Sequence, residues 1–168
     1  MYALHARELR NAATLPDRVG VIEELIGKLK AKLPEYQEFE ANFRELLCSE
    51  KFTKRKPVVQ YVLNRLTQNF LGVRLDAKAM TIEHLANQTG SGFTDEEVAE
   101  VGNLVWVGEK LNSKLGNKSF AEKMRILRSA PVWLDDYIKK QHQQWTPDKI
   151  RERTNHLAKV AYSKVWKL

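Results

Sequence analysis

Residues 80–114 read MTIEHLANQTGSGFTDEEVAEVGNLVWVGEKLNSK, and this segment constrains the architecture more strongly than any other. Met80-Thr81-Ile82 is a short β-type run, and the β-rich run from Val101 to Val107 is a second one that ends at Gly108. Between the two runs, Thr94 is followed three residues later by Glu97, which is a capping box that opens a short helix. The pattern predicts two short strands with polar residues at their joints, followed by a helix.

The residues before this segment are predicted to be helical. Apolar residues recur at steps of three and four after Thr14, after Pro34 and after Pro57, which is the spacing of amphipathic helices. Three such helices can bury one another as a small bundle. A further apolar stripe near the end of the chain predicts a terminal helix. We therefore expect a mainly α fold with a small β part (α+β), divided into a helical region over residues 1–75 and a second domain over residues 76–168.

The composition excludes several classes of protein. The 168 residues include one cysteine, Cys48, which rules out a disulfide framework and a cysteine-based zinc site within one chain. Cys48 follows Leu46 and Leu47 and is expected to be a small buried side chain. No apolar run approaches the roughly 18 residues that cross a bilayer, and the first ten residues lack the apolar core of a signal peptide. We expect a folded, cytoplasmic protein with no membrane association.

The charge is unevenly distributed along the chain. Lys and Arg number 28 against 21 Asp and Glu, so the formal net charge is +7. Residues 51–78 carry seven bases and one acid, whereas residues 83–109 carry six acids and neither Lys nor Arg. Each run can be a solvated helix face. Alternatively, the bases hold a nucleic-acid backbone while the acids hold a cation. The charge pattern alone leaves both interpretations open.

Four short motifs resemble a known family of nucleases. They are Ile82-Glu83-His84-Leu85, Gly102-Asn103-Leu104-Val105, Leu111-Asn112-Ser113-Lys114 and Phe120-Ala121-Glu122-Lys123. Together they resemble the HNH-type (ββα-metal) nuclease signature, and more narrowly the C-terminal nuclease domain of GmrSD-type modification-dependent restriction endonucleases. The tail of that domain is similar to Trp145, Ile150, Arg153, Leu157-Ala158 and Trp166 here. The resemblance covers roughly residues 80–168 and implies a ββα-metal core between an N-terminal helical bundle and C-terminal helices.

The resemblance implies a role for each matched polar residue. His84 would be the general base that takes a proton from the attacking water. Asn103 would complete the catalytic set as a structural member, its amide bracing the loop between the strands. Asn112 would be both a catalytic residue and a metal ligand, together with Glu83. Oxygen ligands suit a hard cation, so Mg²⁺ or Mn²⁺ is expected.

The resemblance also implies partners. Six basic residues are candidates for contact with DNA phosphates: Lys54, Arg55, Lys56, Lys114, Lys118 and Lys123. GmrSD-type proteins also carry a nucleotide-hydrolysing half that senses DNA modification, and this sequence has no Gly-rich phosphate loop of the P-loop kind. We therefore expect the chain to be the C-terminal nuclease part of a larger protein, whose N-terminal sensor half is its partner.

These expectations combine into one leading hypothesis and two alternatives. The leading hypothesis is a metal-dependent DNA endonuclease domain that nicks DNA in a bacterial anti-phage restriction system. The first alternative is a non-catalytic DNA-binding or docking module with a decayed HNH site, and the second is cleavage of RNA. The presence of Glu83, His84 and Asn112 favours the enzyme. His5, His142 and His156 lack comparable surroundings and are predicted to be surface or helix-packing residues.

Overall fold

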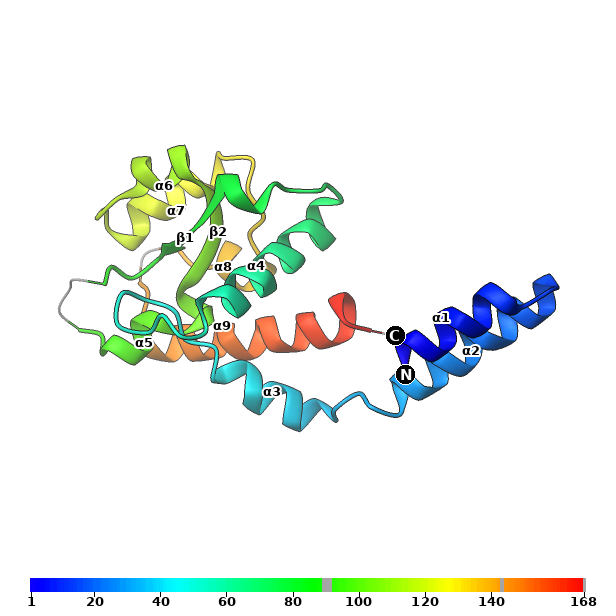
Figure 1. The fold of residues 1–168 in the computed structure, drawn as a ribbon. Helices are drawn as coiled ribbons and strands as arrows, with labels where there is room; N and C mark the ends of the chain where they lie inside the picture. Colours follow the sequence, from blue (N-terminus) through cyan, green and yellow to red (C-terminus); the bar gives the residue numbers. More distant parts are fainter. Residues whose placement is uncertain (89–91, 143, 168) are drawn as a thin grey trace. The chain divides into compact units, whose positions relative to one another are not determined.

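The fold is mainly helical and contains one two-stranded sheet, as the computed structural model of residues 1–88, 92–142 and 144–167 shows (Figure 1). This confirms the predicted α+β class. The elements in chain order are α1 (Tyr2–Asn11), α2 (Leu15–Lys30), α3 (Tyr36–Arg44), α4 (Lys56–Leu71), η1 (Ala77–Ala79), β1 (Met80–His84), α5 (Asp95–Ala99), η2 (Val101–Asn103), β2 (Leu104–Gly108), α6 (Glu109–Leu115), α7 (Phe120–Arg128), α8 (Asp136–Lys139), α9 (Pro147–Val160) and the π-helical turn η3 (Ala161–Val165). No helix of the described residues has the length and apolar composition needed to cross a bilayer.

Contacts divide the chain into two compact units. The first consists of Met1–Glu35 with the residues from Trp166 onward, and the second is Tyr36–Val165. The division expected from the sequence, between residues 75 and 76, falls between α4 and η1, inside the second unit. Helix α4 belongs there because it packs against β2.

The first unit contains a hairpin of α1 and α2. Thr14 caps α2, because its hydroxyl accepts a hydrogen bond from the Asp17 N–H while the Asp17 carboxylate accepts one from the Thr14 N–H. Pro16 occupies the first turn of α2, as the sequence predicts. Helix α1 has no counterpart among the predicted elements. In these two helices, which are described in full, His5 is the one buried residue.

The sheet is formed by β1 and β2, which pair in antiparallel register. Glu83 lies opposite Val105, and His84, the last residue of β1, lies opposite Leu104. Neighbouring side chains on a strand point to opposite faces, so Glu83 and His84 leave β1 on different faces. The second strand begins later than the sequence suggests, because Val101–Asn103 forms a 3-10 turn instead of strand.

One face of the sheet carries the main apolar core. Val105 and Val107 of β2 pack there with Leu115 of α6 and with Met124 and Leu127 of α7. Helix α6 begins directly after β2 and contacts both strands. The order of strand, strand and helix expected from the motifs is therefore present, with α5 and η2 inserted between the strands.

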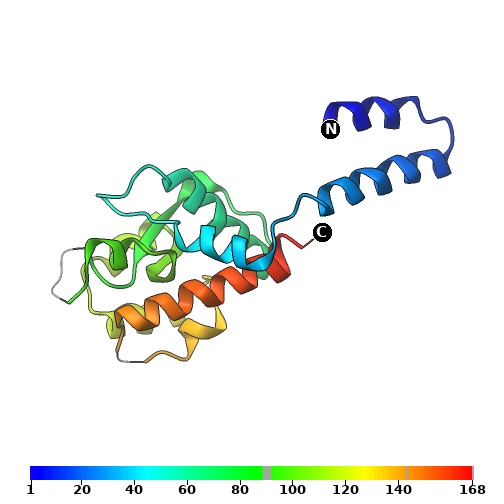
Figure 2. The same ribbon diagram turned by 90° about the horizontal axis from the view of Figure 1, so that it is seen from below.

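The three apolar stripes of the first half are helices, but each has a different main partner. Helix α2 pairs with α1, α3 runs beside α9, and α4 packs against β2 (Figure 2). Rings of Tyr36 and Phe39 on α3 contact Tyr162 of η3, with ring centroids 5.4 and 5.3 Å apart. Of the three helices, α3 and α4 therefore pack mainly on α9 and on the sheet, and α2 packs mainly on α1.

Helix α9 approaches the backbone of η2 very closely. The Gly102 N–H donates to Thr154 Oγ1 at 3.0 Å, and Arg153 Nη1 donates to the Gly102 carbonyl at 2.6 Å. A Cβ atom on Gly102 would lie 2.0 Å from the Ile150 carbonyl oxygen, so only glycine fits here. Arg153 is itself buried and ion-paired with Asp135 at 2.9 Å.

Candidate active site

His84 is held at the end of β1 by two neighbours. Its Nε2 lies 2.9 Å from the Cys48 carbonyl oxygen, and its Nδ1 lies 3.4 Å from the Gln88 side-chain nitrogen. A carbonyl oxygen can only accept a hydrogen bond, so we assign the ring proton to Nε2. The lone pair of Nδ1 is then available to accept a proton. The Cys48 side chain is buried, as predicted.

The surroundings of His84 favour its neutral form. Burial lowers the pKa of His84 most strongly, and the Lys123 ammonium lowers it further, whereas the Cys48 carbonyl and Glu50 act in the opposite direction. The net result is a pKa below the ordinary value of 6.5. At neutral pH the imidazole is therefore uncharged and able to act as a base.

Asn103 braces the chain on both sides of the site. It is completely buried, and its Oδ1 accepts hydrogen bonds from the Ala86 N–H at 2.7 Å and from Trp145 Nε1 at 3.0 Å. Its Nδ2 donates to the carbonyls of Ala86 and Val98 at 3.1 and 2.8 Å. With its amide fully used, Asn103 fixes the residues that follow His84 and cannot reach a substrate.

Glu83 points to the opposite face of the sheet, where it meets Lys123 of α7. The Glu83 Oε1 and Lys123 Nζ atoms are 2.7 Å apart, so the two side chains form an ion pair. Burial raises the pKa of Glu83 above its ordinary value, although Lys123 acts against this shift. The pair is buried on both sides, so Glu83 presents an oxygen to the interior and not to solvent.

Lys123 does not fit the phosphate-binding role expected from its charge. Its side chain is only 1% exposed, and its ammonium donates to the His84 carbonyl at 2.6 Å and to Asn87 Oδ1 at 2.5 Å in addition to pairing with Glu83. Three acceptors use its three N–H groups. Lys123 therefore has a structural role, since its contacts connect α7 to the end of β1.

Asn112 lies on α6, which contacts β1, and its Oδ1 is buried without a hydrogen-bond partner among the described residues. A buried amide oxygen without a partner costs free energy, about 1–3 kcal/mol. Glu83 Oε1 is also buried, but it is ion-paired with Lys123 at 2.7 Å. Amide and carboxylate oxygens are suitable ligands for Mg²⁺ or Mn²⁺, so the residue types present fit the expected cation, for which Glu83 would have to exchange its ion pair with Lys123.

The other basic candidates are exposed. Lys114 and Lys118 lie on and just after α6, and the Asn87 side chain donates to the Lys118 carbonyl at 3.4 Å, which connects this segment to the end of β1. Lys54, Arg55 and Lys56 lie at the start of α4, where the Arg55 guanidinium donates to the Glu45 carbonyl at 2.7 Å.

The structure thus links most of the predicted residues and adds others. Hydrogen bonds and ion pairs connect Glu83, His84 and Asn103 through Lys123, Asn87 and Ala86, whereas no bond connects Asn112 to them within the described chain. No sequence pattern could indicate the role of the Cys48 carbonyl, because any residue supplies a carbonyl. Asn87 and Gln88 could have been suspected as two amides directly after the histidine step.

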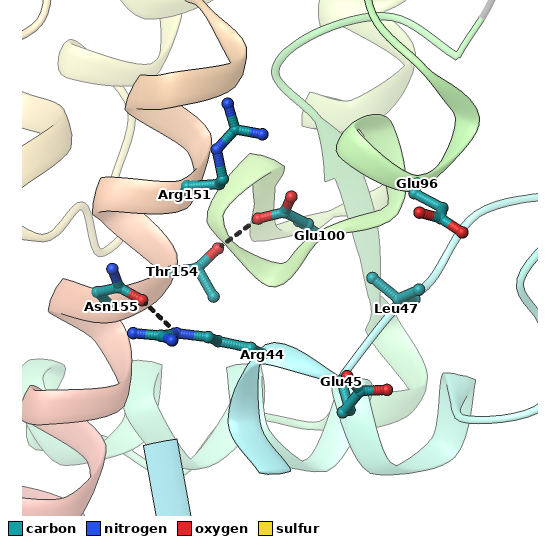
Figure 3. Close-up of a pocket in the computed structure, with 8 residues that line it drawn as sticks. All are labelled: Arg44, Glu45, Leu47, Glu96, Glu100, Arg151, Thr154 and Asn155. Carbon is teal, nitrogen blue, oxygen red and sulfur yellow. Dashed lines mark hydrogen bonds between the residues drawn. The ribbon is translucent and has the colours of Figure 1, made fainter. Parts of the chain in front are cut away.

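A separate pocket of about 450 Å³ lies beside α9 (Figure 3). Its lining is mixed in charge and includes Arg44, Glu45, Leu47, Glu96, Glu100, Arg151, Thr154 and Asn155. Glu100 accepts a hydrogen bond from the Thr154 hydroxyl at 3.2 Å, and Arg44 donates to Asn155 Oδ1 at 2.8 Å. None of these residues belongs to the predicted site, so this pocket is distinct from the surroundings of His84.

Comparison with known proteins supports the resemblance seen in the motifs. Residues 33–160 match the family model described as GmrSD restriction endonucleases, C-terminal domain. The match covers the second unit from before α3 to the end of α9, and it includes every residue linked to His84 above. Searches of curated proteins and of solved structures found no match.

Proposed function

Because the chain belongs to the family of the C-terminal domain of GmrSD restriction endonucleases, we propose that it is a metal-dependent, HNH-type endonuclease domain that nicks DNA. The observation that carries this proposal concerns one of the two expected metal ligands: Asn112 keeps a buried side-chain oxygen that has no hydrogen-bond partner in the described chain. A fold that needed Asn112 only for packing would not leave this oxygen unpaired.

In the proposed reaction His84 acts as the general base. Its Nδ1 accepts a proton from a water molecule, which attacks a backbone phosphodiester and leaves a 5′-phosphate and a 3′-hydroxyl. The Cys48 carbonyl keeps Nε2 protonated and holds the ring in place.

Glu83 and Asn112 would hold Mg²⁺ or Mn²⁺, whose charge would offset the negative charge that grows on the phosphate and the leaving oxygen. Asn103 and Lys123 are positioning residues, since both are buried and both bond to the backbone beside His84. Recognition of modified DNA would come from an N-terminal, nucleotide-hydrolysing half of a longer protein in a bacterial restriction system.

The test is plasmid nicking by the purified chain. We expect Mg²⁺ or Mn²⁺ to support relaxation of supercoiled plasmid and EDTA to stop it. His84→Ala should abolish nicking but leave DNA binding in a gel-shift assay unchanged, because the imidazole supplies chemistry and not affinity. His142→Ala, which removes an exposed histidine, is the matched control and should nick like the wild type.

Other results would select an alternative. A gel shift without nicking under any metal condition supports a DNA-binding module with a decayed site. Cleavage of single-stranded RNA with intact plasmid supports a ribonuclease. Full nicking by clean His84→Ala protein contradicts the assignment of the base.

A further inference from the structure

The hairpin of α1 and α2 buries a histidine whose second ring nitrogen is unused. His5 is 2% exposed, and its Nδ1 lies 2.9 Å from the Met1 carbonyl oxygen. This oxygen can only accept, so Nδ1 carries the proton and Nε2 carries the lone pair. Nε2 is buried and has no hydrogen-bond partner among the described residues. Such a nitrogen is costly unless something binds to it.

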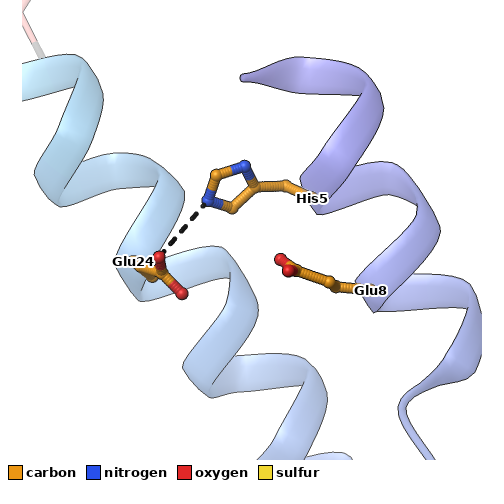
Figure 4. Close-up of side chains that lie close together, drawn as sticks. All are labelled: His5, Glu8 and Glu24. Carbon is orange, nitrogen blue, oxygen red and sulfur yellow. Dashed lines mark ion pairs between the residues drawn. The ribbon is translucent and has the colours of Figure 1, made fainter.

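Two carboxylates lie close to this nitrogen. Glu8 follows His5 by three residues and so shares its side of α1, and Glu24 belongs to α2 (Figure 4). One donor atom from each of the three residues lies within 4.8 Å of the others. The Nε2 atom is 3.9 Å from Glu24 Oε1, which is too long for a hydrogen bond. His5 and Glu24 are thus at the distance of an ion pair, which Figure 4 marks with a dashed line, and no hydrogen bond joins them.

We propose that His5, Glu8 and Glu24 form a binding site for a divalent transition metal ion, with Zn²⁺ as the ion that fits best. One imidazole nitrogen and two carboxylate oxygens are ordinary zinc ligands, and water can fill the remaining position. A metal-bound histidine usually donates its other ring N–H to a carbonyl or carboxylate, as His5 does to Met1. The positive charge of the ion also suits a site that contains two carboxylates.

The site needs only small movements to close on an ion. Ligands about 2.0–2.2 Å from one metal lie no more than about 4 Å apart, so the carboxylates must approach His5 slightly. Glu8 is half-buried and Glu24 is exposed, so neither side chain is enclosed by the protein interior. Glu24 is also ion-paired with Lys28, and this exposed pair is weak enough to be replaced.

A bound ion would stabilise the hairpin, because the hairpin lacks an apolar core. Neither α1 nor α2 contains a buried apolar residue, and Val19, Ile22 and Ile26 of α2 are exposed. Small units without an apolar core are commonly stabilised by a metal, because the binding free energy adds to the free energy of folding. A bound ion would cross-link α1 to α2. The site lies outside residues 33–160 and does not depend on the proposed nuclease function.

The test is competition for Zn²⁺ between the full chain and a chromophoric chelator at pH 7. We expect Glu8→Gln and Glu24→Gln each to weaken one zinc site by about 100-fold or more, since losing even an outer partner costs about 10–100-fold. Glu23→Gln is the matched control, because Glu23 is an exposed neighbour outside the cluster, and it should bind like the wild type. Zinc held at the Glu83 side is the same in all these variants and cancels in the comparison.

A second measurement reports on the hairpin itself. Zn²⁺ should slow hydrogen exchange of the α1 and α2 amides in the wild type and in Glu23→Gln, but not in Glu24→Gln. Wild-type zinc affinity in both Glu8→Gln and Glu24→Gln would overturn the proposal, as would hairpin exchange that Zn²⁺ leaves unchanged. Neither measurement depends on DNA cleavage, so failure here leaves the nuclease proposal untouched.

Discussion

Some residues of the candidate site make side-chain hydrogen bonds that stabilise the fold, whereas others do not. Asn103 makes four hydrogen bonds and Lys123 contacts three acceptors, so removing either would damage the structure. Asn112 is different, because its Oδ1 bonds to no described atom of the protein. Because the Asn112 side-chain oxygen makes no hydrogen bond within the described chain that stabilises the fold, substitution of Asn112 can test its role in catalysis separately from its role in stability.

Asn112→Ala should therefore lower activity without lowering stability. We expect the rate of plasmid nicking to fall by on the order of 100-fold, the effect of losing one group that stabilises developing charge. The free energy of unfolding should stay within about 0.5 kcal/mol of the wild type or rise, because a buried oxygen without a partner is removed. Nicking rates and urea denaturation measure the two effects. A destabilised but fully active variant would show that Asn112 serves packing alone.

At the scale of elements, α9 and η2 depend on their close contact. A Cβ atom at position 102 would lie 2.4 Å from Thr154 Oγ1 as well as 2.0 Å from the Ile150 carbonyl. Gly102→Ala should thus separate α9 from η2 and reduce the free energy of unfolding by about 3 kcal/mol. Gly108→Ala is the control, since its nearest atom, the Ala79 carbonyl oxygen, is 3.9 Å away and demands no movement. Thermal and urea unfolding of the two variants would show whether the contact is as tight as this geometry implies.

The buried pair of Asp135 and Arg153 also anchors α9. Burial alone would raise the pKa of Asp135, but the Arg153 guanidinium and the Ile138 N–H outweigh it and hold this pKa below 3.8. The stabilisation from a lowered carboxyl pKa is present above the unfolded value and is lost as the pH falls through the folded value. Acid below pH 3.8 should therefore weaken the attachment of α9.

Asp135→Asn tests this linkage. At pH 7 it should lower the free energy of unfolding by about 3–5 kcal/mol, because the Arg153 charge stays buried without its partner. The difference in unfolding free energy from the wild type should narrow as the pH falls below 3.8 and through the lowered pKa of Asp135, where the folded wild-type protein also loses this negative charge. Asp136→Asn changes an exposed neighbour and should have little effect at either pH. A constant difference across this pH range would contradict the assigned shift.

The elements also show what the sequence could and could not predict. The strand at Met80, the capped helix at Thr94 and the order of strand, strand and helix follow from local patterns and are confirmed. The prediction that Val101–Asn103 is strand is wrong, because these residues form a 3-10 turn that packs against α9. The contact of His84 with Cys48 spans 36 residues and uses a backbone carbonyl. No local pattern encodes such a contact.

For the whole molecule, the net charge of +7 predicts salt-dependent binding to DNA. If Lys114 and Lys118 contact phosphates, replacing both by Gln should reduce the slope of log binding constant against log salt by about 0.9 for each lysine. Lys159 and Lys164 are also exposed, and replacing both by Gln changes the net charge equally. Filter binding at several salt concentrations compares the two double variants. Equal slopes in both would mean that overall charge, and no local contact, governs binding.

The hydrogen bond from Trp145 to Asn103 has a consequence for how the protein is made. The ribosome synthesises β1 before it reaches Trp145 or Arg153. A growing chain therefore contains the proposed catalytic residues before it contains the side chains that hold Asn103 and Gly102 in place. Under the proposed function, DNA cleavage would therefore begin only after α9 has been synthesised. Truncated products that end before Trp145 would contain His84 and Asn112 but should not nick DNA.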